Sequence, residues 1–320
     1  MPNSSGPNSA EVSEIPGDVI HRMDVLLHRA CKLGPIRVGV IHPCDEISLK
    51  GALDAQEAGL IKPILIAPLA RLSAVAASLG VDLADTEVLD VPHSHAAASK
   101  GVDLASQHRV DALMKGSLHT DELMAAVLGN AAGLSTERRI SHCYVIQTPF
   151  YPRLLLVTDA AINIAPNLAE KLDIVRNAID LSHVMGLERP RVAILAAVET
   201  VNAQMQSTID AAALCKMADR GQINGADLDG PLAFDNAISS EAARIKGISS
   251  SVAGRADILV VPDIESGNML AKQLEYFGQA KSAAIVLGAR VPIILTSRAD
   301  SRETRVASAA LAVLMAHQKT

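Results

Sequence analysis

Serine and arginine stand side by side near the C-terminal end of this 320-residue sequence. Ser297 and Arg298 follow the apolar run Val291 to Leu295, which predicts a buried strand, and a helical pattern begins shortly after them. Ligands of open α/β sheets bind where strands end, and the free N–H groups at a helix start favour anions. The planar guanidinium of arginine also matches phosphate. We therefore predict chemistry at Ser297 and Arg298.

Asp300 and Glu303 have a simpler interpretation. Their spacing of three residues has the form of a capping box, although serine or threonine is the usual cap. We expect Asp300 to cap the last helix of the chain.

A second candidate is the loop between a strand over 110–114 and a helix over 120–128. Glycine at its second position permits close approach of another backbone, lysine supplies charge, and the remaining side chains supply hydrogen bonds. An ordinary strand–helix turn is the alternative interpretation. The residues predicted to bind substrate are Lys115, Gly116, Ser117, His119 and Thr120, with Thr120 capping the helix.

Two further strand ends carry polar residues. Asp159 ends a predicted strand, and Asn163 follows it; a turn is the simpler interpretation. The strand near 258–261 is followed by Asp263, Ser266, Gly267 and Asn268, of which Asp263 and Ser266 could instead cap the next helix. All six are predicted to bind substrate. The segment 229–235 contains Gly-Pro and is predicted to be a turn.

Composition narrows the class of protein. Apolar residues make up 49% of the chain and aromatic residues 2%, so the core must be aliphatic and few rings can stack on bases. A net charge of −6 also argues against a nucleic-acid partner. The four cysteines are scattered, which suits a reducing compartment. Without a signal peptide pattern or an apolar run of about 20 residues, we expect a cytoplasmic protein with no membrane partner and a disordered tail over 1–16.

Strands and helices are predicted to alternate along most of the chain, which indicates an α/β fold with parallel sheets covered by helices. The exception lies at 142–147 and 154–157, where a short connection predicts an antiparallel hairpin. We place a domain boundary there. Fingerprints for dinucleotides, P-loop phosphates and catalytic zinc are absent from the sequence.

Several segments together resemble the phosphate acetyltransferase and phosphate butyryltransferase family. The resemblance covers 35–316 and rests on these segments: 114–116 with 119–120, 158–161 with 163, 229–232, 251–257, 261–263, 266–268 and 296–298. It implies reversible transfer of a short acyl group, acetyl or butyryl, between CoA and phosphate. It implies no permanently bound cofactor and no metal, since CoA, acyl-CoA and phosphate are the substrates.

The resemblance also implies a fold and an assembly. The fold would be two three-layer α/β domains with a cleft, similar to isocitrate and isopropylmalate dehydrogenases. Because the last strand and helix of such proteins return to the first domain, domain I would comprise 17–138 and 290–320, and domain II 139–289. The protein would be a homodimer.

The chemistry needs a held phosphate and a thiolate, since a free thiol has a pKa of about 8.5. The resemblance implies that Arg298 binds the phosphoryl group and that Ser297 hydrogen-bonds the thiol or carbonyl. The acetyl branch has a carboxylate seven residues after the serine as the base for the thiol; Thr304 stands there in this chain, with Glu303 beside it. The acetyl branch also has an arginine near Met124 and Ala125.

Two other functions stay open at this point. One is a metal-assisted NAD-dependent dehydrogenase on the related fold, although the sequence has no convincing cluster of metal ligands. The other is a binding protein for CoA or acyl phosphate without catalytic activity, suggested by the threonine at position 304.

Overall fold

A computed structural model describes residues 22–129, 133–297 and 299–318. The predicted tail over 1–16 and Arg298 lie outside these residues. The strands form one sheet of 11 strands in the order β3-β2-β1-β4-β11-β10-β5-β6-β9-β7-β8. They are β1 (Ile36–Ile41), β2 (Ile61–Ala67), β3 (Glu87–Asp90), β4 (Ala112–Lys115), β5 (Ser141–Gln147), β6 (Leu155–Thr158), β7 (Arg191–Leu195), β8 (Asp227–Leu232), β9 (Ile258–Val260), β10 (Lys281–Leu287) and β11 (Ile293–Ile294).

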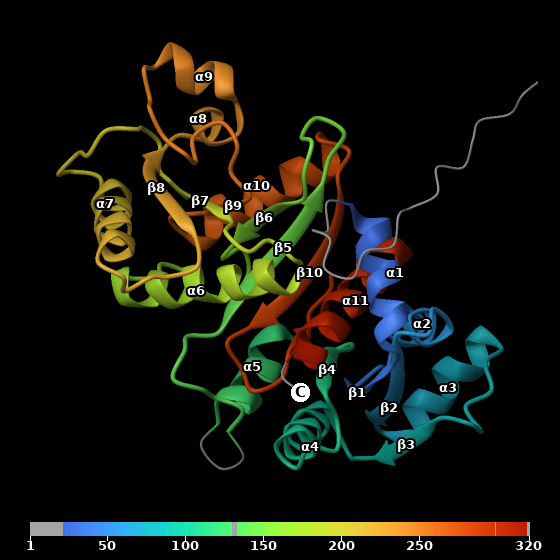
Figure 1. The fold of residues 1–320 in the computed structure, drawn as a ribbon. Coiled ribbons are helices and arrows are strands. Elements are labelled where there is room, and N and C mark those ends of the chain that lie inside the picture. Colours follow the sequence, from blue (N-terminus) through green and yellow to red (C-terminus); the bar gives the residue numbers. More distant parts are fainter. Residues whose placement is uncertain (1–21, 130–132, 298, 319–320) are drawn as a thin grey trace, which may run out of the picture.

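Helices cover both faces of this sheet (Figure 1). They are α1 (Met23–Leu33), α2 (Glu46–Glu57), α3 (Leu69–Leu79), α4 (Ser94–Ser106), α5 (Thr120–Leu128), α6 (Leu168–Val184), α7 (Gln206–Asp219), α8 (Phe234–Ile238), α9 (Ser240–Ile245), α10 (Ile264–Tyr276) and α11 (Arg302–Gln318). Within the described ranges, no helix is long and apolar enough to cross a membrane.

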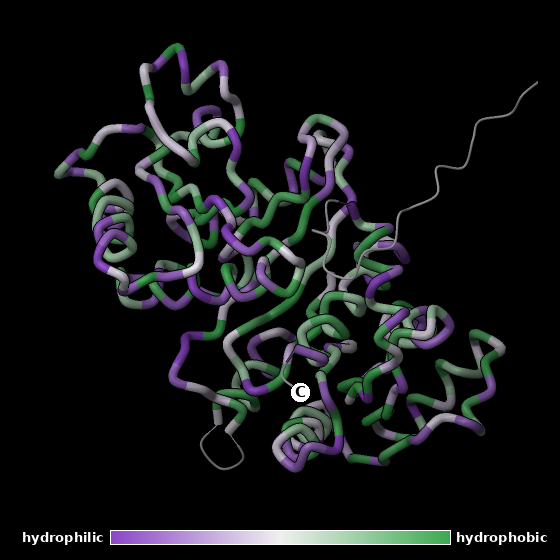
Figure 2. The backbone as a smooth tube through the Cα atoms, in the orientation of Figure 1, coloured by the Kyte–Doolittle hydropathy of each residue, from purple (hydrophilic) through white to green (hydrophobic). Residues whose placement is uncertain are grey.

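The two faces of the sheet are packed differently. On one face, buried side chains of α1, α2, α3, α6, α7 and α11 form a single hydrophobic cluster that runs through both ends of the molecule. On the other face, α4 and α5 bury one cluster, and α8, α9 and α10 bury a separate one. Figure 2 shows the central strands as mostly apolar segments, with polar segments concentrated in the surrounding helices and loops.

The sheet is mixed rather than parallel, which corrects the prediction of parallel sheets. The predicted hairpin is confirmed, since β5 pairs antiparallel with β6. β10 is antiparallel to β5 and to β11, whereas β11 is parallel to β4 and β6 is parallel to β9. β6 and β9 therefore run opposite to β4 and β11, and the two sets of strand ends leave the sheet in opposite directions.

The segment 229–235 was predicted as a turn and is mostly strand. β8 pairs in parallel with β7 and extends to Leu232, and α8 begins at Phe234. Local composition misled the prediction because Gly230 and Pro231 are turn residues. Here tertiary packing favours glycine, since a Cβ at Gly230 would lie 2.8 Å from the Ile194 carbonyl oxygen on β7.

A buried ion pair joins α6 to α7. Lys171 Nζ lies 2.7 Å from Asp210 Oδ2, and the exposed fractions of the two side chains are 7% and 6%. Gln206 Nε2 donates a second hydrogen bond to Asp210 at 2.8 Å. The geometry satisfies both charges inside the fold.

Removing one partner should be costly, because it leaves a buried charge unpaired. We expect Lys171→Met to lower the free energy of unfolding by about 3–5 kcal/mol, measured by urea denaturation. The double substitution Lys171→Met with Asp210→Leu should recover most of that loss, because an apolar pair carries no buried charge. A single variant as stable as the wild type would contradict a structural role for the pair.

Candidate functional site

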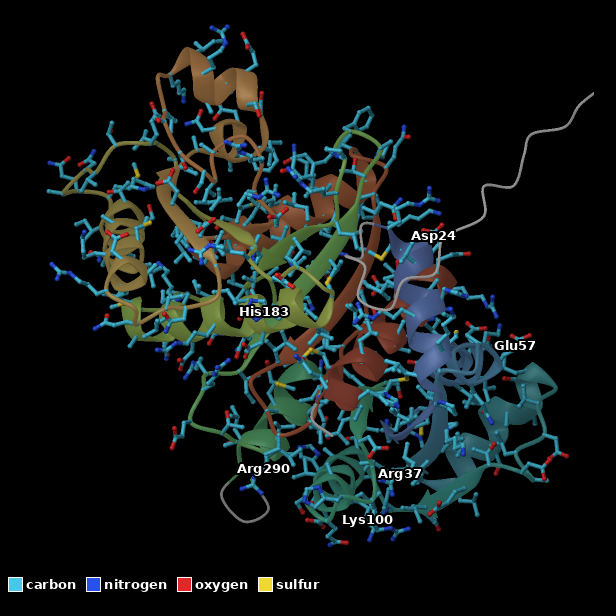
Figure 3. All side chains as sticks on the ribbon, in the orientation of Figure 1. Asp24, Arg37, Glu57, Lys100, His183 and Arg290 are labelled. Carbon is cyan, nitrogen blue, oxygen red and sulfur yellow. The ribbon has the colours of Figure 1, made fainter. Side chains whose placement is uncertain are left out.

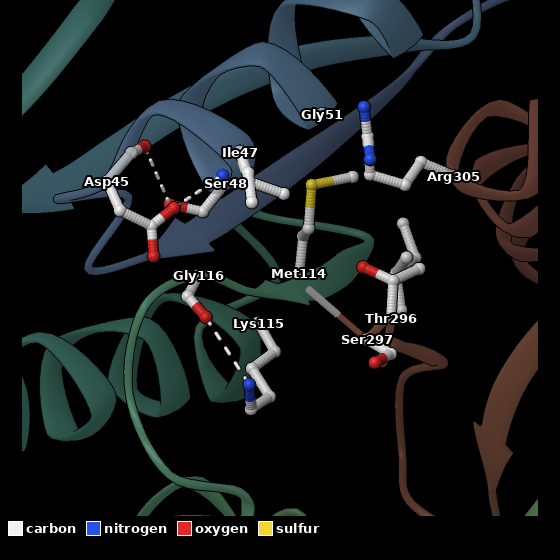
Figure 4. Close-up of a pocket in the computed structure, with 11 residues that line it drawn as sticks. Asp45, Ile47, Ser48, Gly51, Met114, Lys115, Gly116, Thr296, Ser297 and Arg305 are labelled. Atoms are coloured by element: carbon white, nitrogen blue, oxygen red, sulfur yellow. Dashed lines mark hydrogen bonds between the residues drawn. The ribbon is translucent and has the colours of Figure 1, made fainter. Parts of the chain in front are cut away.

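The carboxyl ends of β1, β4 and β11 meet at a small cavity, which we call the Ser297 cavity (Figure 4). Its volume is about 30 Å³. It is lined by Asp45, Ile47, Ser48, Gly51, Met114, Lys115, Gly116, Ile294, Thr296, Ser297 and Arg305. The structure thus brings Lys115, Gly116 and Ser297 together from two regions far apart in the sequence.

Gly116 is required because two backbones approach closely there. A Cβ at this position would lie 2.4 Å from the carbonyl oxygen of Ile41 and 2.6 Å from that of His42. The contact fixes the loop after β4 against the end of β1. The Lys115 side chain folds over this loop, with Nζ 3.4 Å from the Gly116 carbonyl oxygen (Figure 4).

Ser117 holds the same two loops together with its side chain. Its Oγ donates to the His42 carbonyl oxygen at 2.8 Å and accepts from the Cys44 N–H at 3.1 Å. The ring Nδ1 of His42 lies 3.1 Å from Ser117 Oγ, and burial lowers the pKa of His42. The hydroxyl of Ser117 is thus occupied within the protein.

Ser297 begins a tight turn at the mouth of β11. Its N–H donates to Asp300 Oδ2 at 2.7 Å, and its Oγ accepts from the Ala299 N–H at 3.3 Å. Asp300 N–H donates back to the Ser297 carbonyl oxygen at 3.1 Å. The turn therefore holds the Asp300 carboxylate next to the Ser297 backbone.

The prediction that Asp300 caps the last helix is wrong. α11 begins at Arg302, and the Thr304 N–H donates to Ser301 Oγ at 3.2 Å, so Ser301 is the cap. The serine directly before the helix satisfies the free N–H group. The carboxylate of Asp300 turns back toward Ser297 instead.

Asp159 and Asn163 form a buried hydrogen-bonded loop after β6. Their exposed fractions are 2% and 3%. The Asp159 carboxylate accepts from the N–H groups of Ala161, Ile162 and Asn163 and from Asn163 Nδ2. Burial raises the pKa of Asp159, and these hydrogen bonds oppose the rise. The geometry gives both residues a structural function.

The start of α10 packs on this loop. Asp263 caps the helix, accepting from the Ser266 N–H at 2.8 Å and from Ser266 Oγ at 2.7 Å. A Cβ at Gly267 would lie 2.6 Å from the Asp159 carbonyl oxygen, and Asn268 Nδ2 donates to the Ala160 carbonyl oxygen at 3.3 Å. The predicted capping alternative for Asp263 thus describes its contacts.

Residues of α5, of the segment before β5 and of the loop after β6 line a cavity of about 550 Å³, which we call the Arg139 cavity. It places Thr120 and Met124 of α5 opposite Ala161 and Ile162 of the loop after β6. Arg139 Nε donates to Asn163 Oδ1 at 2.7 Å. The predicted cap of α5 is off by one residue, since His119 occupies the cap position and Thr120 is the first helical residue.

Comparison with known proteins identifies the family of this chain. Residues 93–313 match the model of the family described as phosphate acetyl/butaryl transferase. The chain is 60% identical over 298 residues to a phosphate acetyltransferase of Rhizobium meliloti, covering 93% of this chain and 94% of that protein. The chain belongs to the phosphate acetyl/butyryl transferase family.

Two further relatives support the family assignment. A phosphate butyryltransferase of Clostridium acetobutylicum is 44% identical over 88% of this chain and 94% of its own length. The crystal structure of a branched-chain phosphotransacylase from Enterococcus faecalis V583 has a TM-score of 0.77 and 30% identity, covering 88% of this chain and 99% of that one. The family, the enzyme class of acyltransferases and the α/β fold predicted from the sequence are thereby confirmed.

Sequence reasoning missed other residues at the family's candidate site. Asp45, which caps α2, and Arg305, on the first turns of α11, both line the Ser297 cavity. A Cβ at Gly51 would lie 2.9 Å from Arg305 Cδ, so the arginine packs closely on α2. For Asp45 the sequence signal was the polar strand–helix junction after β1. Arg305 had no such signal, because it reaches the cavity through tertiary packing.

The buried Asp159 carboxylate gives a test that separates structure from binding. Asp159→Ala removes the acceptor of three backbone N–H groups and of one of the two Asn163 Nδ2 hydrogens, so we expect a loss of at least about 1–3 kcal/mol in the free energy of unfolding. Urea denaturation measures this. A variant with wild-type stability and a raised KM for CoA or phosphate would instead identify Asp159 as a binding residue.

Proposed function

We propose that this chain catalyses the reversible reaction of acyl-CoA with phosphate to give acyl phosphate and CoA. Ser297 carries the proposal, because β11 delivers it to the same cavity as Lys115 and Gly116 at the carboxyl ends of β1 and β4. CoA and phosphate act as substrates, with no permanently bound cofactor.

Acetyl is the acyl group that the relatives favour. Identity to the Rhizobium meliloti phosphate acetyltransferase is 60%, against 44% to the Clostridium acetobutylicum phosphate butyryltransferase. Met124, in the Arg139 cavity, stands near the arginine position of the acetyl branch and supports some acceptance of butyryl. The rates of arsenolysis of acetyl-CoA and butyryl-CoA would rank the two acyl groups as substrates. No CoA release from either would support a binding protein without catalytic activity.

The roles of the two central residues follow from their chemistry. Arg298 binds the phosphoryl group by its guanidinium, and Ser297 hydrogen-bonds the reacting thiol or carbonyl. The start of α11 adds the partial positive charge of its N-terminus. Lys115 and Gly116 contribute charge and backbone to the same site. The other substrate-binding residues predicted from the sequence act through the loops that they hold, as for Ser117 and Asp159.

Removal of the guanidinium should reduce transition-state stabilisation. We expect Arg298→Ala to lower kcat by about 10²–10³-fold, measured with acetyl phosphate and CoA. Arg302→Ala is the matched control, because Arg302 pairs with Asp54 and Glu57 of α2 at 2.8 Å each. An Arg298→Ala enzyme with wild-type kcat and wild-type KM for phosphate would rule out its assigned role.

The division into two domains is part of the same proposal. Domain I comprises 17–138 and 290–320, domain II comprises 139–289, and the pair is similar to isocitrate and isopropylmalate dehydrogenases. Three observations support this: β11 pairs with β4, α11 packs against α1 and α2, and separate hydrophobic clusters lie under α4–α5 and α8–α10. The four free cysteines support the proposed cytoplasmic location.

A homodimer is supported by an apolar groove on the part of the chain assigned to domain II. All three phenylalanines of the chain line it: Phe150, Phe234 and Phe277 are 75%, 36% and 84% exposed. The groove has a volume of about 700 Å³. Contiguous exposed apolar surface commonly marks an interface, and a two-fold dimer would bring the same surface of each copy together.

A charge in this groove should disrupt the dimer. We expect Phe277→Asp to shift the protein from dimer to monomer in sedimentation velocity, because the carboxylate would lose its water at the interface. Leu33→Asp, at the exposed end of α1, is the control and should leave the dimer intact. A Phe277→Asp protein that stays dimeric would place the interface elsewhere.

A further inference from the structure

Thr304 occupies the position seven residues after Ser297, in the first turn of α11. Its side chain is largely buried, with Oγ1 3.4 Å from Ser301 Oγ and 3.5 Å from Ser282 Oγ. A hydroxyl of this kind exchanges hydrogen bonds but is a poor proton acceptor at neutral pH. Because a thiol with a pKa of about 8.5 is mostly protonated there, another group must take its proton.

Asp300 is a carboxylate that the fold turns toward Ser297. Its Oδ2 accepts from the Ser297 N–H at 2.7 Å, and Ser301 rather than Asp300 caps α11. The bond to Ser297 uses one of the two carboxylate oxygens. Asp300 is therefore held one hydrogen bond from the residue assigned to the reacting thiol or carbonyl.

A large cavity opens beside this carboxylate, and we call it the Asp300 cavity. Its volume is about 620 Å³, against about 30 Å³ for the Ser297 cavity. Pockets of about 300–1,000 Å³ are typical for small ligands. α1, α10, the start of β10 and the start of α11 surround it. Ser297 lines the smaller cavity and Asp300 lines the larger one, and the hydrogen bond between them joins the two sites. A thiol-bearing chain bound in the larger cavity would therefore lie beside the Asp300 carboxylate.

Charged groups face Asp300 from several elements. Lys272 and Glu275 come from α10, joined at 2.8 Å, and Arg305 of α11 donates to the Asp300 carbonyl oxygen at 2.6 Å. Burial raises the pKa of Tyr144 on β5 to about 12; Lys272 opposes the rise, and the charges of Glu275 and Asp300 add to it.

The remaining charged groups at the rim of this cavity are Asp24 at the start of α1 (Figure 3), Lys281 on β10 and Glu303 on α11. Burial raises the pKa of Asp300 and Glu275 adds to the rise, whereas the hydrogen bond from the Ser297 N–H and the charges of Lys272 and Arg305 oppose it. A raised pKa of the carboxyl group lies closer to the pKa of the thiol, and this favours proton transfer between them.

We infer that Asp300 is the general base for the CoA thiol, an inference that rests on the proposed acyl transfer. The S–H proton moves to the Asp300 carboxylate as sulfur forms its bond to the carbonyl carbon of the acyl phosphate. The C–O bond to phosphate then breaks, its electron pair leaves with the phosphate oxygen, and the proton on Asp300 passes to that phosphate. In the reverse direction Asp300 returns the proton to the departing thiolate.

The pH dependence of acyl-CoA formation tests this role. We expect Asp300→Asn to lower kcat/KM for CoA at pH 7 by about 10²–10⁴-fold, while its amide oxygen still accepts from the Ser297 N–H and keeps the turn. Without a base, the rate should follow the thiolate fraction and rise about tenfold per pH unit up to the thiol pKa of about 8.5. The wild type should reach a plateau above the pKa of Asp300, at lower pH.

Two further variants complete the experiment. Asp300→Glu keeps a carboxylate and should keep a plateau, and Glu303→Gln should keep the wild-type shape of the profile. A wild-type profile in Asp300→Asn, or a lower rate with that profile unchanged, overturns the inference; so does loss of the plateau in Glu303→Gln. A wild type that forms no acyl-CoA from acetyl phosphate or butyryl phosphate overturns the proposed function itself, together with the inference.

Discussion

The pairing of β11 with β4 is the constraint on which the site depends. β11 is two residues long, yet it is parallel to β4 and brings the chain back beside a strand laid down about 180 residues earlier. Parallel neighbours end at the same edge of a sheet, so Ser297 leaves β11 where Lys115 leaves β4. The close contact of Gly116 with the carbonyl groups of Ile41 and His42 then fixes the position of the loop after β4 relative to the end of β1. The Ser297 cavity exists because these two backbone contacts coincide.

The same end of the chain shows how neighbouring residues divide the work. Ser301 caps α11, Arg302 binds α2, and Arg305 holds the Asp300 backbone. Because these three residues secure the start of the helix, the Asp300 side chain is available to face Ser297. A carboxylate that capped the helix would instead be committed to backbone N–H groups.

Local pattern predicted the elements well where one strand or helix decides its own state. α5 ends at the predicted residue, and the β5–β6 hairpin was expected from its short connection. The direction of β6 and β9 relative to β4 could not be predicted from local pattern, because it depends on which strands β10 joins. The polar residues after β4 and β6 were all expected to bind substrate. The structure places Lys115 and Gly116 in the Ser297 cavity, whereas Thr120 lies with the loop after β6 in the Arg139 cavity. Asp300 was assigned as a cap from its spacing alone, since the competing serine at 301 was one position away.

The hydrophobic layer that continues under both ends of the sheet limits how the molecule can flex. A bend that opened this face would expose apolar surface at about 25 cal/mol per Å², whereas the opposite face is already divided between two clusters. The two halves of the molecule can therefore separate on the face with the two clusters, while the face with the continuous cluster stays packed. A motion of this kind would leave the pairing of the central strands intact.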